Sequence, residues 1–205
     1  MEQLNIHIQP LQKKDFGRAQ QYTIDCMHLN NLVDSYFAKF FSAHYWYMEV
    51  AKATLALGAY NKEKLVGVML VEEYGKPKLF SHWLLTPLLY LMTLVVSYFY
   101  QKANIYYETN ELFEKEFKKM NDADGEILYF AVDPVFNGNG IGSLLLKEVE
   151  KRNQGKSFYL FTDTECTYQF YEKRGFLRQC KRDITMKANG KDVQLTCFLY
   201  NKTFD

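Results

Sequence analysis

The chain has 205 residues, with 25 basic and 24 acidic side chains and a formal net charge of +1. A chain of this length can bury one hydrophobic core of ordinary size, so residues 1–205 are expected to form a single domain. The balanced charge gives no basic surface that would attract nucleic acid or an anionic membrane, and neither is an expected partner.

The cysteines and the N-terminus bear on the cellular compartment. Cys26, Cys166, Cys180 and Cys197 are widely spaced and form no C-x-x-C pair, so no metal site and no disulfide framework is expected. The first ten residues lack the basic and apolar segments of a signal peptide. The expected location is a reducing cytoplasm.

The N-terminal part of the chain predicts a strand followed by two helices. Leu4–Ile8 alternates apolar and polar residues, as a half-buried strand does, and 15–29 has helical periodicity. Asp34 is a candidate cap for a second helix that continues to about Val50. This helix carries an aromatic stripe, interpreted as core rather than as the wall of a binding site. The stripe consists of Tyr36, Phe37, Phe40, Phe41 and His44.

The middle of the chain predicts a hairpin and then an apolar insertion. Leu55–Tyr60 and Leu65–Glu72 flank a polar turn and are expected to pair. The stretch 79–100 has no Asp, Glu, Lys or Arg and is long enough to span a membrane. Pro87 interrupts it, and a single span would separate strands of one sheet, so we favour one or two buried helices over membrane association.

A charged helix is expected after this stretch, over 108–120. Its apolar residues recur at helical spacing and predict an inner face. They are Leu112, Phe113, Phe117 and Met120.

The most informative stretch begins at Glu126. The apolar run Glu126–Val132 predicts an interior strand, which ends at Asp133-Pro134 because proline cannot donate to a sheet. Gly138, Gly140 and Gly142 follow, and helical spacing of apolar residues starts at 141. Glycines at a helix N-terminus leave unpaired N–H groups that suit a phosphate. The spacing is neither G-x-G-x-x-G nor a P-loop.

The C-terminal part predicts one more helix end and three strands. Gly155 fits the end of the helix that starts near 141, and 157–161 is a short apolar strand. Asn189-Gly190 lies between the alternating segments 183–187 and 193–200, and this dipeptide is a strong hairpin signal.

Two motifs in this half of the chain resemble the GNAT superfamily of N-acyltransferases. Residues 137–142, NGNGIG, resemble its acyl-CoA loop, Gln/Arg-x-x-Gly-x-Gly/Ala, with Asn137 in place of Gln or Arg. Residues 164–176, TECTYQFYEKRGF, resemble its second signature, Asn-x-x-Ala-x-x-x-Tyr-x-x-x-Gly-Phe. Tyr171, Gly175 and Phe176 match, whereas Thr164 and Thr167 replace the usual Asn and Ala.

The resemblance implies an α/β fold with a mixed, mostly antiparallel central sheet of about seven strands flanked by helices. A helical apolar insertion would occupy about 79–120, before the central strand. The implied activity is transfer of an acetyl group from acetyl-CoA to a primary amine of a small molecule or protein, in a ternary complex. The alternatives are a non-catalytic acyl-CoA-binding module, motivated by Asn137 and Thr164, and a membrane-associated acyltransferase anchored by 79–100. GNAT proteins often dimerise, so a homodimer is possible.

The resemblance also implies roles for individual residues. Tyr171 would be the general acid, and Glu126 is the first choice for the general base, because some family members carry a glutamate there. Glu108, Glu111, Asp124, His82 or a chain of water molecules remain alternatives for the base. No metal is implied. The residues expected to bind acetyl-CoA are Phe130, Ala131, Val132, Asn137, Gly138, Asn139, Gly140, Ile141, Gly142, Ser143 and Thr164.

Overall fold

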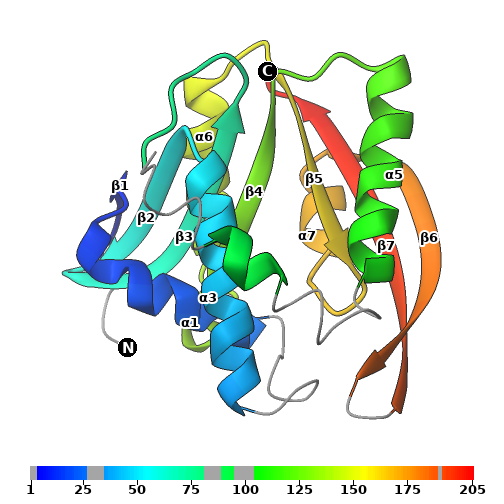
Figure 1. Ribbon diagram of the computed structural model, residues 1–205. Coiled ribbons are helices and arrows are strands. Elements are labelled where there is room, and N and C mark those ends of the chain that lie inside the picture. The colour runs from blue at the N-terminus through cyan, green and yellow to red at the C-terminus, as the bar shows by residue number, and fades with distance from the viewer. Residues whose placement is uncertain (1–3, 27–34, 81–88, 95–103, 189–190) are drawn as a thin grey trace.

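The computed structural model describes residues 4–26, 35–80, 89–94, 104–188 and 191–205 (Figure 1). The strands are β1 (Ile6–Pro10), β2 (Leu55–Asn61), β3 (Lys64–Glu73), β4 (Gly125–Val132), β5 (Ser157–Asp163), β6 (Leu177–Ala188) and β7 (Lys191–Thr203). The helices are α1 (Phe16–Cys26), α3 (Ser35–Lys52), α5 (Asn104–Met120), α6 (Ile141–Arg152) and α7 (Gln169–Glu172). Two short 3₁₀ turns, η1 (Lys13–Asp15) and η2 (Pro134–Phe136), complete these elements.

All seven strands belong to one sheet, in the order β1-β2-β3-β4-β5-β7-β6. Neighbouring strands are antiparallel except β4 and β5, which are parallel. The sheet is therefore mixed and mostly antiparallel, and helices flank it, as the sequence predicted.

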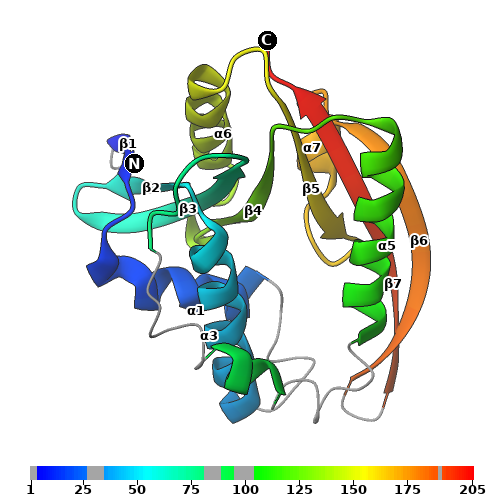
Figure 2. The ribbon, with the colours of Figure 1, turned by 45° about the horizontal axis from the view of Figure 1, so that its top comes forward.

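Helices cover both faces of this sheet. In Figures 1 and 2, α6 and α7 lie on one face, and α1, α3 and α5 lie on the other. The apolar side of α6, with Ile141 and Leu145, packs against Met69 of β3. Trp46 of α3 belongs to a second core on the opposite face, and Phe113 of α5 to a third, over β5 and β7. The sheet is thus buried from both sides, which accounts for its long apolar strands.

The feature that shapes the centre of the molecule is the separation of β4 from β5. These strands pair only at Gly125 with Phe158 and at Glu126 with Tyr159. The register of β4 against β3 shifts around Leu128, as a β-bulge does. Beyond Glu126 the two strands diverge, as Figure 1 shows. The main chain from 127 to 132 therefore has no strand partner on the side of β5 within the described sheet.

Several predicted boundaries need correction. The strands β6 and β7 are longer than the predicted segments 183–187 and 193–200, because they pair with each other along nearly their whole length. Basic residues on the exposed side of these strands hid the alternation of apolar and polar residues in the sequence. Helix α5 starts earlier, at Asn104, and Met120 is 81% exposed because it ends the helix beyond the apolar core. Asp34, His28, His82 and the Asn189-Gly190 turn lie outside the described residues.

The apolar stretch 79–100 is only partly buried where the structure describes it: Phe80 packs against the core beside α3. Residues 89–94 include a short helical segment, and Tyr90, Leu91 and Leu94 are exposed. Thr93 of this segment contacts His44 of α3. None of the described helices is long and apolar enough to cross a membrane.

Candidate active site

The glycine turn leads directly into α6 and leaves its N-terminus open. Asp133 is held by Arg18 at 2.8 Å, and its carboxylate accepts a hydrogen bond from the backbone N–H of Val135 at 3.1 Å. Gly138 and Gly140 have φ angles of 82° and 75°, which side-chain-bearing residues rarely adopt. The first helical hydrogen bond joins Leu144 N to Gly140 O, so the three N–H groups before it point out of the helix end.

Gly142 allows α6 to approach β4 and α7 closely. A Cβ atom at this position would lie 2.9 Å from the ring of Phe130 and 3.1 Å from the ring of Phe170. Such distances are shorter than van der Waals contact, so a side chain at 142 would push the helix N-terminus away from the sheet.

A cavity of about 960 Å³ lies in the separation between β4 and β5. It extends from the glycine turn at the start of α6 to Glu49 of α3 and Glu114 of α5. Most of the residues predicted from the sequence line it. These are Glu126, Phe130, Ala131, Val132, Asn137, Gly138, Gly140, Ile141, Gly142, Ser143 and Tyr171.

Asn139 and Thr164 are not among the residues that line this cavity. The Asn139 side chain is exposed, and its amide donates to the carbonyl of Phe136 at 3.1 Å. The Thr164 hydroxyl accepts from the backbone N–H of Thr196 at 3.1 Å. Both side chains therefore stabilise their own loops, and their contact with a ligand stays a prediction.

Tyr171 lies in a group of aromatic rings at the edge of the cavity. Its ring centroid is 5.6 Å from that of Phe176 and 6.3 Å from those of Phe130 and Tyr200. Burial raises the pKa of its phenol well above the ordinary value. The hydroxyl is therefore protonated at neutral pH and available as a proton donor.

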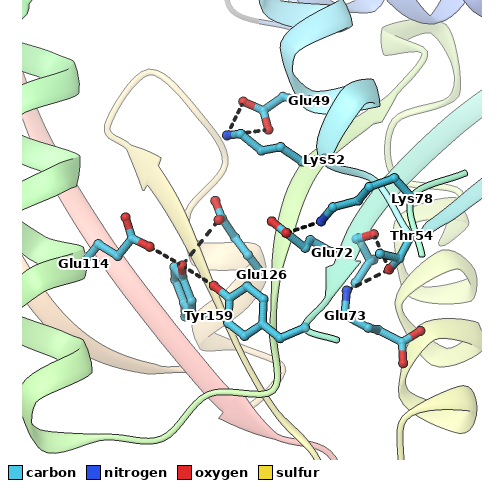
Figure 3. Close-up of polar contacts among 11 residues, drawn as sticks. Glu49, Lys52, Thr54, Glu72, Glu73, Lys78, Glu114, Glu126 and Tyr159 are labelled. Carbon is cyan, nitrogen blue, oxygen red and sulfur yellow. Dashed lines mark hydrogen bonds and ion pairs between the residues drawn. The ribbon is translucent and has the colours of Figure 1, made fainter. Parts of the chain in front are cut away.

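Glu126 lies on the cavity wall at the point where β4 and β5 separate (Figure 3). Burial raises the pKa of its carboxyl group to about 8. The positive charge of Lys52 opposes this rise, and the carboxylates of Glu49 and Glu114 add to it. A carboxyl group with such a pKa can accept a proton near neutral pH.

The other candidate bases are less suited to this role. Glu111 lines the cavity but is largely exposed, and Glu108 borders a separate pocket. The carboxylate of Asp124 accepts from the backbone N–H of Ser157 at 2.8 Å, which is a structural contact. Glu126 is the candidate that combines burial with a position in the cavity.

Part of the aromatic stripe on α3 faces the cavity, contrary to its interpretation as core. Phe41 and His44 line it, together with Tyr45, whereas Tyr36 is 87% exposed. The stripe pattern could not reveal this, because a cavity wall and a core need the same helical spacing of large side chains.

Arg174 is a site residue that the sequence did not single out. Its guanidinium stacks 3.6 Å from the ring centroid of Phe170 and donates to Ser143 Oγ and to the Phe170 carbonyl. It therefore brings a positive charge to the open end of α6, on the cavity wall. The only sequence signal for this role was an arginine between Tyr171 and Gly175, and the motif specifies no residue type at that position.

The described residues contain no group of His, Cys, Asp or Glu that could hold a metal ion. Cys26, Cys166, Cys180 and Cys197 are free thiols.

Comparisons with known proteins agree with this geometry. Residues 115–178 match the model of the acetyltransferase (GNAT) domain, which covers the glycine turn and the Tyr171 motif. No curated protein matches the sequence.

Solved structures of acetyltransferases share the fold over nearly the whole chain. One from Corynebacterium glutamicum, described as histone acetyltransferase HPA2 and related acetyltransferase, has a TM-score of 0.57 and 15% identity, over 98% of this chain and 97% of its own. PaiA N-acetyltransferase from Thermoplasma acidophilum, in complex with coenzyme A, has a TM-score of 0.55 and 16% identity, over 98% and 100%. An N-acetyltransferase from Staphylococcus aureus Mu50 has a TM-score of 0.56 and 13% identity, over 98% and 99%.

The matched domain model and the shared fold agree with the glycine turn at α6, the separated strands and the tyrosine motif. Residues 115–178 are thus similar in sequence to the GNAT acetyltransferase domain, and the chain shares its fold with solved acetyltransferases.

Proposed function

We propose that this protein transfers an acetyl group from acetyl-CoA to a primary amine in a ternary complex. One observation carries this proposal: a single cavity connects the open N-terminus of α6 with Tyr171 and Glu126, through the separation of β4 and β5. This reaction needs a phosphate-binding end, a passage lined by main chain, and two groups that can exchange protons.

The residues present fit the cofactor. The N–H groups of 141–143 and the positive end of the α6 dipole suit the pyrophosphate. Arg174 adds a full positive charge beside Ser143 and so replaces the long donor that is lost at Asn137. The unpaired main chain of β4 would meet the pantetheine arm and the thioester carbonyl at Phe130 and Val132, where a fixed N–H stabilises a developing oxyanion.

The two titratable groups divide the proton transfers between them. An ammonium group must lose a proton before its nitrogen can attack, and Glu126, with a pKa of about 8, can take it. The attack forms an N–C bond and breaks the C–S bond of the thioester. The departing thiolate gains a proton from the phenol of Tyr171, which burial keeps protonated.

Tyr171→Phe tests the catalytic part of this proposal. We expect turnover to fall by about 10²-fold, because general acid catalysis contributes this much, while the Kd for acetyl-CoA stays unchanged. Tyr168→Phe is the matched control, because Tyr168 lies three residues earlier, packs on Phe198 and does not line the cavity. Full turnover in Tyr171→Phe would exclude this residue as the acid.

A non-catalytic acyl-CoA-binding module is the second candidate. The short side chain at Asn137 and the loop contact of Thr164 with Thr196 favour it. Both functions predict binding of acetyl-CoA. Only the enzyme releases free CoA when a panel of amines is added, so detection of the thiol during such a screen separates them.

A further inference from the structure

The hydroxyl of Tyr159 lies between two carboxyl groups at the closed end of the cavity. Tyr159 is the register partner of Glu126 in the last pair before β4 and β5 diverge, and its side chain is fully buried. The hydroxyl donates to Glu114 Oε1 at 3.0 Å and lies 3.4 Å from Glu126 Oε2. Figure 3 shows this arrangement, and the hydroxyl of Tyr74 lies 2.7 Å from that of Tyr159.

Charged groups from α3, β3, α5 and the segment after β3 surround Glu126. The three carboxylates that act on it each have a lysine partner, and these pairs are Glu49 with Lys52, Glu72 with Lys78, and Glu114 with Lys118. Glu126 forms no ion pair with any described residue. Its contact with Tyr159 is therefore its main polar interaction within the described part of the chain.

A single proton on the Tyr159 hydroxyl has to serve both carboxyl groups. Glu114 also accepts from Lys118 at 2.6 Å, so it keeps one donor whichever way the hydroxyl turns. When Glu126 is protonated, it can donate to the oxygen of Tyr159 while Tyr159 donates to Glu114. When Glu126 is ionised, the hydroxyl can turn to it instead.

We infer that Tyr159 is a positioning residue that couples Glu126 to Glu114, so that the two carboxyl groups share one proton across its hydroxyl. The inference deepens the proposed function, on which its catalytic meaning rests. When the amine transfers a proton, the N–H bond of the ammonium breaks and an O–H bond forms on Glu126. The new carboxyl group then donates to Tyr159, which holds Glu126 in place.

The electrostatics of the three groups agree with this geometry. Burial raises the pKa of Glu126 to about 8. Burial acts to raise the pKa of Glu114 as well, but hydrogen bonds from Lys118 and Tyr159 outweigh it and lower this pKa. Burial and the charge of Glu126 raise the pKa of Tyr159, so its hydroxyl stays neutral. Below a pH of about 8 the shared proton therefore resides on Glu126, with the negative charge on Glu114, whereas above this pH Glu126 is ionised and can take the proton of the amine.

The test is an NMR titration of protein labelled with ¹³C at glutamate carboxyl groups, with Glu126→Gln used to assign the Glu126 signal. We expect Glu114→Gln to lower the titration midpoint of Glu126 by about one pH unit, because it removes a nearby negative charge. The glutamine oxygen still accepts from Tyr159, so a merely structural role of Glu114 predicts no shift. An unchanged midpoint would overturn the coupling.

A second comparison tests whether the coupling passes through the hydroxyl. In a Tyr159→Phe background, Glu114→Gln should shift the Glu126 midpoint by less than about half as much. Equal shifts in both backgrounds would show a through-space effect alone and contradict the inference. Tyr74→Phe is the matched control, since it removes the neighbouring hydroxyl and leaves Tyr159 between the carboxyl groups. Glu111→Gln controls for an exposed carboxylate on the same helix.

If Tyr159→Phe fails to fold, the NMR signal of Tyr159 itself tests the inference. In the wild-type protein, the ¹³Cζ signal of Tyr159 should titrate with the same midpoint as Glu126, and this midpoint should move in Glu114→Gln. A Tyr159 signal that does not follow Glu126 would contradict the inference. Because the titration needs no turnover, an inactive protein with coupled signals would refute the proposed function alone.

Discussion

No pattern in the sequence predicted a role for Arg174, although its guanidinium brings a specific phosphate-binding group to the end of α6. Stacking on Phe170 and the hydrogen bond to Ser143 fix its guanidinium beside the end of α6. The side chain therefore loses little conformational entropy when a ligand binds. A positioned guanidinium forms strong, often bidentate bonds to phosphate. Arg174 therefore accounts for how this chain could bind a pyrophosphate with asparagine at 137.

Arg174→Gln is expected to weaken CoA binding by about 10-fold or more, since a hydrogen bond to a charged group contributes roughly 1.5–3 kcal/mol. Binding of acetyl-pantetheine, which has no pyrophosphate, should not change. Calorimetric titration with both ligands measures this difference. Arg178→Gln is the control, because Arg178 bonds to Glu172 and Tyr200 instead. Equal losses for both ligands would mean that Arg174 acts through the fold.

Tyr171 and Glu126 could be predicted as site residues because each belongs to a local sequence pattern. Tyr171 lies in a spaced motif, and Glu126 begins an apolar strand. The sequence could not show that lysines neutralise the neighbouring carboxylates, or that Tyr159 contacts Glu126. These contacts join residues from α3, α5 and β5, and their approach depends on the packing of the whole sheet.

At the scale of elements, the closed end of the separation between β4 and β5 depends on Gly125. A Cβ atom there would lie 2.1 Å from the carbonyl oxygen of Glu72 and 2.4 Å from the ring of Phe158. Neither the backbone of β3 nor a fully buried ring can move away cheaply. Gly125 therefore permits the close approach of β3, β4 and β5 from which the cavity opens.

Gly125→Ala is expected to destabilise the protein by about 3 kcal/mol, as overpacking of a dense core does. Gly17→Ala is the matched control: Gly17 lies in α1 with no atom within 4 Å of an added Cβ, and alanine in a helix is favoured by about 0.5–1 kcal/mol. Urea unfolding, compared by the transition midpoint at constant slope, measures both changes. Equal stability of the two variants would contradict the steric role of Gly125.

The elements themselves were largely predictable, since alternation and helical spacing are local properties of the chain. The β2–β3 hairpin, the strand β4 and the helix α6 lie close to their predicted positions. The bulge near Leu128 and the divergence of β5 were not predicted from these residues, because they depend on which strand pairs with which. The cavity follows from this divergence.

At the scale of the whole molecule, one sheet with helices on both faces holds both halves of the site. The N-terminal half supplies α3, with Phe41, His44 and Tyr45, and the C-terminal half supplies the glycine turn and Tyr171. The amine acceptor would therefore lie between α3 and β4. The exposed Tyr90, Leu91 and Leu94 are compatible with a contact between two copies, and the homodimer stays a prediction.

The central claim is that the cavity between β4 and β5 binds acyl-CoA, and calorimetric titration of the folded protein with acetyl-CoA and free CoA tests it most directly. We predict one site with a Kd of about 1–100 μM, since an open helix N-terminus, a guanidinium and a preformed cavity all contribute. Absence of binding by either ligand, in protein shown to be folded by its unfolding transition, would contradict the claim.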